Sequence, residues 1–587
     1  MKVHAHSTLH PVRIGLLFLL PSLALGEAGF YRLSWRGDPS TSMVIGWNQI
    51  SGSNPEVCYD TVDHGKKAIA YPGRRVPDRV VEYRGMNNHF VRLENLEPDT
   101  AYYFVVCDSE GVGRRLWFRT ASATPKPFTC IIGGDSRSNP EPRREGNKLV
   151  AKLRPLFVLF GGDYTGSGQS DQWKEWFEDW QLTISEDGRI YPIIATHGNH
   201  ESFDMQMMEK LFDTPHPDQY YSLGIAGELM RIWVLNSELE YKCPDKVPEQ
   251  QAWIESDLPR HSDTQWKLAT YHCPMRAHTA HKPEGKSRIA AWARLFYNNG
   301  VDLVAESDTH MVKRTYPVRP FDGKGSYESF IRDDEAGMVF IGEGSWGAPM
   351  RAANDDKPWT MASDSFHQFK WIQVSSKEML IRTVKFENVD AVVPLTEDNL
   401  FQEPENMVFW KPETGKILRL PFDVAHSTYA TSSEARVLFG LGGEWEWSLD
   451  GQSWATATAP LGYGDNHVRT SVVPDGTEPR SILFRKTFPV GDPALVSRLF
   501  FDLLADDGCV VKLNGAEVIR RNMPNGEILT ETLALKRVAA WWGNKAVSLP
   551  VDPKFLKKGV NTIEASVHQH SPGSSDLIFD LAVRVKE

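Results

Sequence analysis

The chain has 587 residues, more than one hydrophobic core can serve, and at about 150 residues per domain it predicts three or four domains. Its 65 Lys and Arg residues against 76 Asp and Glu residues give a net charge of −11, so it lacks the basic surface that binds nucleic acid. The composition therefore argues against a nucleic-acid scaffold.

The N-terminus has the pattern of an export signal. Lys2 and Arg13 precede an apolar run at residues 14–25, and Ala24 and Gly26 are spaced like the small residues before a signal-peptidase cut. The run is shorter than the ~20 apolar residues of a membrane helix, with an uncleaved anchor as the alternative, and no later stretch is long enough to span a bilayer. We expect a signal peptide at 1–26 and a secreted or periplasmic protein with no transmembrane segment.

Residues 27–124 alternate apolar and polar side chains in short runs such as SMVIGWNQI and RLWFRT, separated by turn signals. This pattern predicts a small β-sandwich of immunoglobulin or fibronectin III type. Cys58 and Cys107 lie in two of its strands, and either an oxidised pair or two free, buried thiols fits the pattern; we favour free thiols. None of the six cysteines has the C-x-x-C spacing of a zinc knuckle.

Residues 125–388 alternate apolar strands with helical segments, which predicts a layered α/β domain. One of these helices, SDQWKEWFEDW, places three tryptophans and a phenylalanine on one face as core residues, with Ser170 as its expected N-cap. Five of the strands end in residues that ligate metals. These are Asp135 in GGDSR, Asp163 in GGDYTG, Asn199 with His200 in GNHE, His272 in YHCP, and Asp308 with His310 in SDTH.

The strand ends are expected to converge, because loops beyond the carboxyl ends of strands in an α/β sheet meet at one crevice. Each residue alone has an ordinary explanation: a Gly-Asp pair is usually a turn, and a lone His after a strand usually a hydrogen-bonded residue. Carboxylate, amide and imidazole groups together suit Mn, Fe or Zn. The ordered set therefore predicts a site for two divalent metal ions, with one Asp between them.

The remaining chain divides into a connector and a terminal β domain. Residues 389–435 are irregular and contain prolines, and we expect them to wrap the central domain. Residues 436–587 return to alternating strands with Asn514-Gly515 as a tight hairpin turn, which predicts a jelly-roll β-sandwich. Trp541 and Trp542 fit either a sugar-stacking platform or its core.

These motifs, in this order and after a β-sandwich, resemble the calcineurin-like metallophosphoesterases and, among them, the purple acid phosphatase branch. The resemblance covers residues 30 to 385, and GNHE is its most specific part. It implies a βαββα four-layer sandwich with a dinuclear centre that hydrolyses phosphate esters. Residues 436–587, through LGYGD, DDGCVVKLNG and VHQHSPGSSD, resemble galactose-binding-like modules, which leaves carbohydrate as an alternative ligand of this domain.

The resemblance also implies roles for single residues. Asp135 and His310 would bind the first ion, Asp163 would bridge, and Asn199, His272 and Asp308 would bind the second. His200 matches the histidine that contacts the leaving group or phosphate. His278 and His281 lie where substrate-contacting histidines occur in the family, with ordinary solvated loop histidines as the alternative. Arg137 either pairs with a phosphoryl oxygen or forms a structural salt bridge.

Three positions depart from the family pattern. Asp308 stands where the last family motif, Gly-His-x-His, has its first histidine; Gly166 stands where purple enzymes have a tyrosine; and Arg137 replaces a His or Gly. Without a tyrosinate ligand we expect a colourless protein. The added carboxylate favours harder ions such as Mn²⁺ or Fe²⁺ and raises the pKa of bound water, so we expect a pH optimum nearer neutral than acid.

The sequence thus predicts a secreted dinuclear-metal phosphoesterase that hydrolyses phosphate monoesters or diesters through attack of a metal-bound hydroxide. The alternative is an extracellular carbohydrate-binding or adhesion protein in which a degenerate phosphoesterase domain serves as scaffold.

Overall fold

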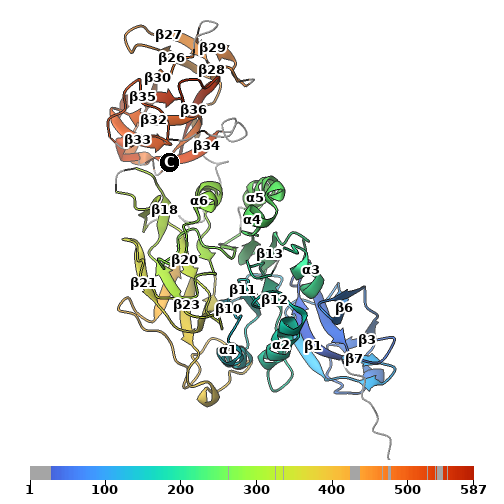
Figure 1. Ribbon diagram of the computed structural model, residues 1–587. Helices are drawn as coiled ribbons and strands as arrows, with labels where there is room; N and C mark the ends of the chain where they lie inside the picture. Colours follow the sequence, from blue (N-terminus) through green and yellow to red (C-terminus); the bar gives the residue numbers. More distant parts are fainter. Residues whose placement is uncertain are drawn as a thin grey trace, which may run out of the picture.

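The computed structural model describes residues 28–586 except 202, 262–263, 324, 335, 423–435, 466, 474–477, 497, 525, 536, 538–545 and 552. The expected signal peptide, Trp541 and Trp542 lie outside the described residues. None of the helices in the described part of the chain combines the length and apolar character that crossing a membrane requires. Figure 1 shows the β-rich N-terminal part, the mixed central part and the β-rich C-terminal part following one another along the molecule.

The N-terminal part forms two antiparallel sheets that face each other. One sheet has the order β1 (Ala28–Ser34), β2 (Met43–Gln49), β6 (Met86–Leu93), β5 (Arg79–Tyr83). The other has the order β4 (Gly73–Arg75), β3 (Glu56–Asp60), β7 (Ala101–Asp108), β8 (Gly111–Val112), with β9 (Leu116–Arg119) also paired to β7. The alternating sequence pattern is explained by this arrangement, because one face of each strand enters the shared core. Cys58 and Cys107 are free thiols with their sulfur atoms 3.2 Å apart.

The central domain is built on two sheets. The first has the order β12 (Ile193–Ala195), β11 (Phe157–Phe160), β10 (Phe128–Gly133), β22 (Gln368–Val374), β23 (Glu378–Lys385), β24 (Ile417–Pro421). The second has the order β13 (Tyr221–Ile225), β14 (Met230–Val234), β15 (Trp266–Thr270), β16 (Leu303–Ala305), β20 (Val339–Gly342), β17 (Val312–Thr315), β21 (Thr360–Asp364). Strand β24 comes from the expected connector, which therefore completes the sheet edge as well as packing on the domain.

Helices cover both outer faces of this pair of sheets. Helices α1 (Pro140–Leu153), α2 (Ser170–Trp180) and α3 (Met207–Phe212) pack on the first sheet. Helices α5 (Val247–Arg260) and α7 (Arg294–Asn298) pack on the second, and α7 continues from α6 (Lys286–Arg288) through a π-helical turn at Ile289–Ala293. The order of helix, sheet, sheet, helix agrees with the four-layer prediction.

Helix α2 shows both a confirmed and a wrong expectation. Trp173, Trp176 and Trp180 are at most 1% exposed, so the aromatic face is core as predicted. Ser170 does not cap the helix, because it is the first helical residue and Gln169 occupies the N-cap without a side-chain hydrogen bond. The aromatic packing fixes the helix start without that bond.

Asp213, at the C-terminal end of α3, connects the central domain to the N-terminal sandwich. Its buried carboxylate accepts hydrogen bonds from Arg92 at 2.8 Å and Arg79 at 2.7 Å, and Arg36 lies 3.3 Å away. Burial alone would raise the pKa of Asp213, but the hydrogen bonds from Arg92 and Arg79 lower it below its usual value. One charged cluster thus holds the two domains together.

The C-terminal part consists of two facing sheets around a separate core. One contains β29 (Thr470–Ser471), β28 (Leu461–Tyr463), β36 (Leu577–Lys586), β31 (Arg498–Asp506) and β34 (Val547–Val551), with β25 (Arg436–Phe439) paired to β36. The other contains β27 (Ala455–Thr458), β26 (Glu444–Ser448), β30 (Ser481–Val490), β35 (Gly559–His568), β32 (Gly508–Leu513) and β33 (Ala516–Arg521). Asn514 and Gly515 both have positive φ and form the predicted hairpin turn between β32 and β33.

Candidate metal centre

The seven predicted site residues on the strand ends lie at the edge where both central sheets end. Strands β10, β11 and β12 are parallel neighbours in one sheet, and β15 and β16 are parallel neighbours in the other. Each strand is followed directly by a polar loop, so the side chains of both sheets meet at their carboxyl ends. This topology brings together residues that are as far as 175 positions apart in the sequence, such as Asp135 and His310.

One group of potential ligands consists of Asp135, Asp163 and His310. Their ligand atoms all lie within 4.8 Å of one another, and all three side chains are at most 1% exposed. Asp135 Oδ1 is 3.3 Å from His310 Nε2 and has no hydrogen-bond partner among the described residues. A buried carboxylate oxygen without a partner is unfavourable unless a cation takes it up.

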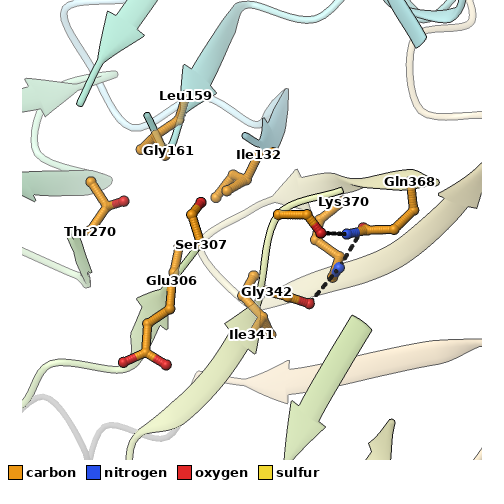
Figure 2. A pocket seen from close by; sticks show the side chains of 13 residues that line it. Ile132, Leu159, Gly161, Thr270, Glu306, Ser307, Ile341, Gly342, Gln368 and Lys370 are labelled. Carbon is orange, nitrogen blue, oxygen red and sulfur yellow. Dashed lines mark hydrogen bonds between the residues drawn. The ribbon is translucent and has the colours of Figure 1, made fainter. Parts of the chain in front are cut away.

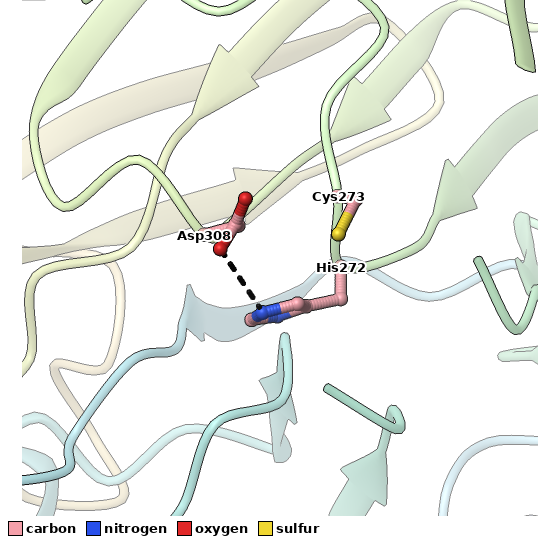
Figure 3. Close-up of side chains that lie close together, drawn as sticks. All are labelled: His272, Cys273 and Asp308. Atoms are coloured by element: carbon pink, nitrogen blue, oxygen red, sulfur yellow. Dashed lines mark ion pairs between the residues drawn. The ribbon is translucent and has the colours of Figure 1, made fainter. Parts of the chain in front are cut away.

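A second group consists of His272, Cys273 and Asp308, whose ligand atoms also lie within 4.8 Å of one another (Figure 3). Asn199 Oδ1 is 3.0 Å from His272 Nε2, and Asp163 Oδ1 is 3.3 Å from the same nitrogen. Asp163 therefore lies between the two groups. Cys273 was not expected here, because its only sequence signal is its place directly after His272.

Hydrogen bonds outside the centre orient the ligands. His272 Nδ1 donates to the Gly161 carbonyl at 2.7 Å and His310 Nδ1 to the Pro349 carbonyl at 2.8 Å, which leaves Nε2 of each ring for the centre. The carboxylate of Glu201, the last residue of GNHE, accepts hydrogen bonds from the backbone N–H groups of Asp163, Tyr164 and Gly198. Glu201 is fully buried and fixes the two loops against each other.

The backbone of the centre is strained. Asp135, Asp163, Asp308 and His310 have φ values of 57°, 57°, 70° and 58°, in the left-handed region that such residues seldom adopt. Each such residue costs about 1–3 kcal/mol, and clusters of them are typical of functional sites. Gly344 lies so close that a Cβ atom there would be 1.7 Å from Asp135 Oδ2.

Three cationic side chains accompany the three carboxylates. Arg137 Nε is 3.2 Å from Asp163 Oδ2, Lys282 Nζ is 2.5 Å from Asp308 Oδ1, and Arg351 donates to the Asp308 carbonyl at 2.7 Å. Burial alone would raise the pKa of Asp308, but the charges of His272 and Lys282 lower it. Burial likewise opposes the charged form of His272, but the carboxylates of Asp163, Asp135 and Asp308 raise its pKa well above the usual value. The Asp308 carboxylate is therefore held as an acceptor.

The histidines proposed to contact substrate differ in position. His200 Nδ1 donates to the Gly166 carbonyl at 2.5 Å, and its Nε2 lies 3.8 Å from Asp163 Oδ2 with the side chain 29% exposed. His281 is exposed, and no side-chain contact joins it to the centre among the described residues. His278 is buried away from the centre, where Nε2 contacts Thr360 Oγ1 at 2.8 Å. The next residue after His281, Lys282, is the one that reaches Asp308.

Gly166, at the position where purple enzymes have a tyrosine, makes a different contact in this chain. Gly166 supplies the carbonyl group that orients His200. Tyr164 is fully buried and stacks on Phe160 with ring centroids 4.4 Å apart, within the aromatic core. Trp346 is also fully buried in that core, so it packs and does not stack on a ligand.

A small cavity of about 10 Å³ lies between the two sheets behind the centre (Figure 2). Ser307 and Lys370 line it, and Lys370 Nζ donates to the Gly342 carbonyl at 3.2 Å and to Gln368 Oε1 at 2.6 Å. Its volume suits about one water molecule and excludes a substrate. Burial lowers the pKa of Lys370 well below its usual value. The cavity is thus part of the support beneath the SDTH loop.

The donor set fits a pair of divalent cations. It offers three carboxylates, two imidazoles, one amide oxygen and one thiol in two groups that share Asp163. Two features fit ligands of a metal ion: the Asp135 oxygen with no hydrogen-bond partner among the described residues, and the hydrogen bond from each imidazole Nδ1–H to a carbonyl.

Comparison with known families gives two matches. Residues 30–123 match the family described as "Purple acid Phosphatase, N-terminal domain", and residues 140–312 match "Calcineurin-like phosphoesterase". The second range contains six of the seven strand-end residues, Asp135 being the exception.

The curated relatives that the chain resembles include two purple acid phosphatases and a phosphoenolpyruvate phosphatase. The chain is 25% identical over 321 residues to purple acid phosphatase 18 of Arabidopsis thaliana, covering 52% of this chain and 68% of the relative. It is 26% identical over 312 residues to a purple acid phosphatase of Glycine max and 25% identical over 300 residues to a phosphoenolpyruvate phosphatase of Allium cepa, covering 47% of this chain in both and 63% and 60% of the relatives. A solved purple acid phosphatase from yellow lupin (Lupinus luteus) aligns with a TM-score of 0.49 at 15% identity, over 62% of this chain and 73% of its own.

Proposed function

We propose that this chain, which has the N-terminal domain of purple acid phosphatases followed by a calcineurin-like phosphoesterase domain, is a secreted dinuclear-metal phosphoesterase that hydrolyses phosphate monoesters or diesters. The observation that supports it best is the pair of ligand groups on either side of Asp163. A single Asp shared by two clusters is what a two-metal hydrolytic site needs.

The assignment of residues follows the two groups. Asp135, Asp163 and His310 would hold one ion, and Asp163, Asn199, His272 and Asp308 the other, with the Cys273 thiol as an added donor. The proposed domains are a signal peptide at 1–26, a fibronectin III-like domain at 27–124, the phosphoesterase at 125–388, a connector at 389–435 and a jelly-roll, galactose-binding-like domain at 436–587. The ions are Mn, Fe or Zn, and carbohydrate stays a proposed ligand of the last domain.

When bound, such ions offset phosphoryl charge and make a water molecule acidic enough to act as nucleophile. The chain contributes the rest. The Arg137 guanidinium faces the centre beside Asp163 and can pair with a non-bridging oxygen of the ester. His200 keeps its Nδ1–H on the Gly166 carbonyl, so a proton for the leaving oxygen would come from Nε2 of the protonated ring. His281 would contact the outer part of the substrate from its exposed position.

The test is Asp163→Asn in the full-length protein, with Asp390→Asn as a control that makes the same change at an exposed side chain. Metal content and turnover of p-nitrophenyl phosphate and its bis ester would be measured for both. We expect Asp163→Asn to lower turnover by at least about 10³-fold, because several kcal/mol of transition-state stabilisation depend on the paired ions. Normal turnover in Asp163→Asn would contradict the proposal.

The alternative, a binding protein on a degenerate phosphoesterase scaffold, draws support from the ion pair between Lys282 and Asp308, which occupies one potential ligand. A wild-type protein that retains no Mn, Fe or Zn and turns over neither ester would favour it. Two tightly held ions per chain would exclude it.

A further inference from the structure

A cavity of about 240 Å³ lies between the central domain and the C-terminal sandwich. The wall that the central domain contributes comes from α7 and from strand β18 (Val318–Pro320) with the residues that follow it. Its other wall comes from β33, β34 and the short helix Pro553–Phe555. Figure 1 shows the C-terminal sandwich next to β18 and α6, far from the N-terminal domain.

Positive charge dominates the lining of this cavity. Five cationic side chains face it against the carboxylates of Asp322 and Glu517; the five are Arg294, Arg319, Arg520, Arg521 and Lys554. Glu517 is already paired, since it accepts hydrogen bonds from Arg520 at 2.7 and 2.6 Å. Asp322 is exposed to solvent. Outside the lining, Asp333 Oδ2 lies 3.6 Å from Arg319 Nε and offsets a further positive charge. Even so, the lining has more positive than negative side chains.

Arg294 and Arg521 carry that excess, one from each domain. Neither guanidinium makes a hydrogen bond or an ion pair with any residue in the described part of the chain. Burial lowers the pKa of Arg294 to about 10 although Asp322 opposes this, and repulsion from Arg521 adds to it. Burial also lowers the pKa of Arg521. Both side chains are only partly exposed. A partly buried guanidinium without a counter-charge is unfavourable, and repulsion between two of them adds to that cost.

Asp506 is the carboxylate that acts on Arg521, but it offsets little of the charge of that side chain. Asp506 lies at the end of β31, and burial together with repulsion by Asp507 raises its pKa to about 8. The raised pKa weakens Asp506 as a counter-charge for Arg521. Among the described residues, a full counter-charge for Arg294 and Arg521 is therefore missing.

The rest of the lining is apolar and aromatic, with Tyr297, Phe321, Ile519 and Phe555 among its residues. Guanidinium groups suit tetrahedral oxyanions through paired N–H donors, and the apolar wall suits an organic body. The volume is below the ~300 Å³ of drug-sized sites, so the ligand is small. We propose that this cavity binds a small organic molecule carrying a phosphate or sulfate group, which Arg294 and Arg521 hold between the two domains.

Such a ligand would touch the segment that also borders the metal centre. Helix α7 continues from α6, where Arg288 donates to the carbonyl of Pro274, two residues after His272. Binding in the cavity thus fixes the C-terminal sandwich against an element that supports the centre. The inference does not require that the centre be active.

The experiment is calorimetric titration of the full-length protein with glucose 6-sulfate, which lacks a phosphoester for the metal centre to hydrolyse. Glucose serves as the neutral probe and inorganic phosphate as the probe without an organic body. The variant is R294Q/R521Q, and the matched control is R469Q/K512Q, which removes two positive charges from exposed positions of the C-terminal sandwich.

We expect saturable binding of glucose 6-sulfate to wild type and to R469Q/K512Q, no binding of glucose, and at least about tenfold weaker binding to R294Q/R521Q, since charged hydrogen bonds are lost. R294K/R521K keeps both charges but loses the paired N–H donors, so its affinity for glucose 6-sulfate should lie between those of wild type and R294Q/R521Q. Such an intermediate affinity would show that the loss in R294Q/R521Q does not come from misfolding. Asp163→Asn should bind as wild type does, which separates this site from the proposed hydrolytic one. Equal binding to R294Q/R521Q and wild type, equal binding of glucose, or no binding of glucose 6-sulfate to wild type would each overturn the inference.

Discussion

Gly344→Ala would test how tightly the centre is built. Gly344 has a φ of +73°, and an added Cβ would lie 1.7 Å from Asp135 Oδ2, whereas real Cβ atoms stay beyond 3.0 Å. The carboxylate, which is fully buried, must therefore retreat by more than about 1 Å. Such a displacement takes one proposed ligand out of the first group.

Gly344→Ala has two expected effects, one on stability and one on turnover. The left-handed backbone costs Ala about 1–2 kcal/mol of stability wherever it occurs. Gly65→Ala is the matched control, because its φ is +60° and nothing lies within 4 Å of an added Cβ. Only Gly344→Ala moves Asp135, and a shift of about 1 Å in a reacting group costs about 100-fold in rate, or about 2.7 kcal/mol of activation free energy.

The assay combines urea unfolding, bound metal per chain and turnover of p-nitrophenyl phosphate. We expect Gly344→Ala to lose more stability than Gly65→Ala, because only Gly344→Ala must also displace a buried carboxylate. Only Gly344→Ala should lose metal and about 100-fold in turnover. If Gly344→Ala bound as much metal and turned over as fast as Gly65→Ala, the assignment of Asp135 as a ligand would be refuted.

Three further predictions concern other parts of the molecule. In protein loaded with Co²⁺, Cys273 should give a near-ultraviolet thiolate-to-cobalt absorption band that Cys273→Ser lacks; identical spectra would remove Cys273 from the ligand set. Asp213→Asn should lower the free energy of unfolding by about 3 kcal/mol at pH 7, because it removes the buried carboxylate that Arg36, Arg79 and Arg92 share. The native pKa of Asp213 is lowered, so this stabilisation is present above about pH 4, the unfolded value, and is lost as the pH falls through the native pKa; an undiminished difference at pH 3 would contradict the cluster. Turnover should peak nearer neutral than acid pH in a colourless protein, and a maximum below about pH 5 would speak against the effect assigned to Asp308.

The sequence predicted best the residues that directly follow the strands of the central domain, because the sheet topology determines where those residues meet. Each of the five apolar strands ended directly before a polar loop, and parallel strands bring such loops together whatever the distance along the chain. Asp135, Asp163, Asn199, His272 and His310 are therefore placed together as expected. Their roles as ligands stay predictions.

The sequence was less informative for side chains that reach the centre from loops. Lys282 and Arg351 carry no motif, and their approach to Asp308 depends on the path of loops that no periodicity describes. Cys273 follows His272 immediately and, in an alternating strand, would point to the opposite face; the strand ends at Thr270, which allows both residues to face the centre.

Two local expectations failed for a common reason. Ser170 is a good N-cap residue, yet the tryptophans of α2 set the position of the helix and leave Gln169 at its start. Residues 417–421 have little periodicity, yet they pair with β23 as an edge strand. Tertiary packing decides both cases, and local propensity is too weak to oppose it.

The exchange of an imidazole for Asp308 has a consequence for the whole centre. A third carboxylate in a buried site needs compensation, and the ammonium group of Lys282 supplies it at 2.5 Å. An ion that binds Asp308 must compete with that ammonium group, whereas an ion at Asp135 meets an oxygen with no hydrogen-bond partner in the described part of the chain. If the two groups bind ions as proposed, the two positions are therefore unequal: the first is ready for a cation, and the second becomes ready only when Lys282 releases Asp308. Lys282 directly follows His281, which is proposed to contact the substrate, so the same loop supplies the ammonium group that pairs with Asp308.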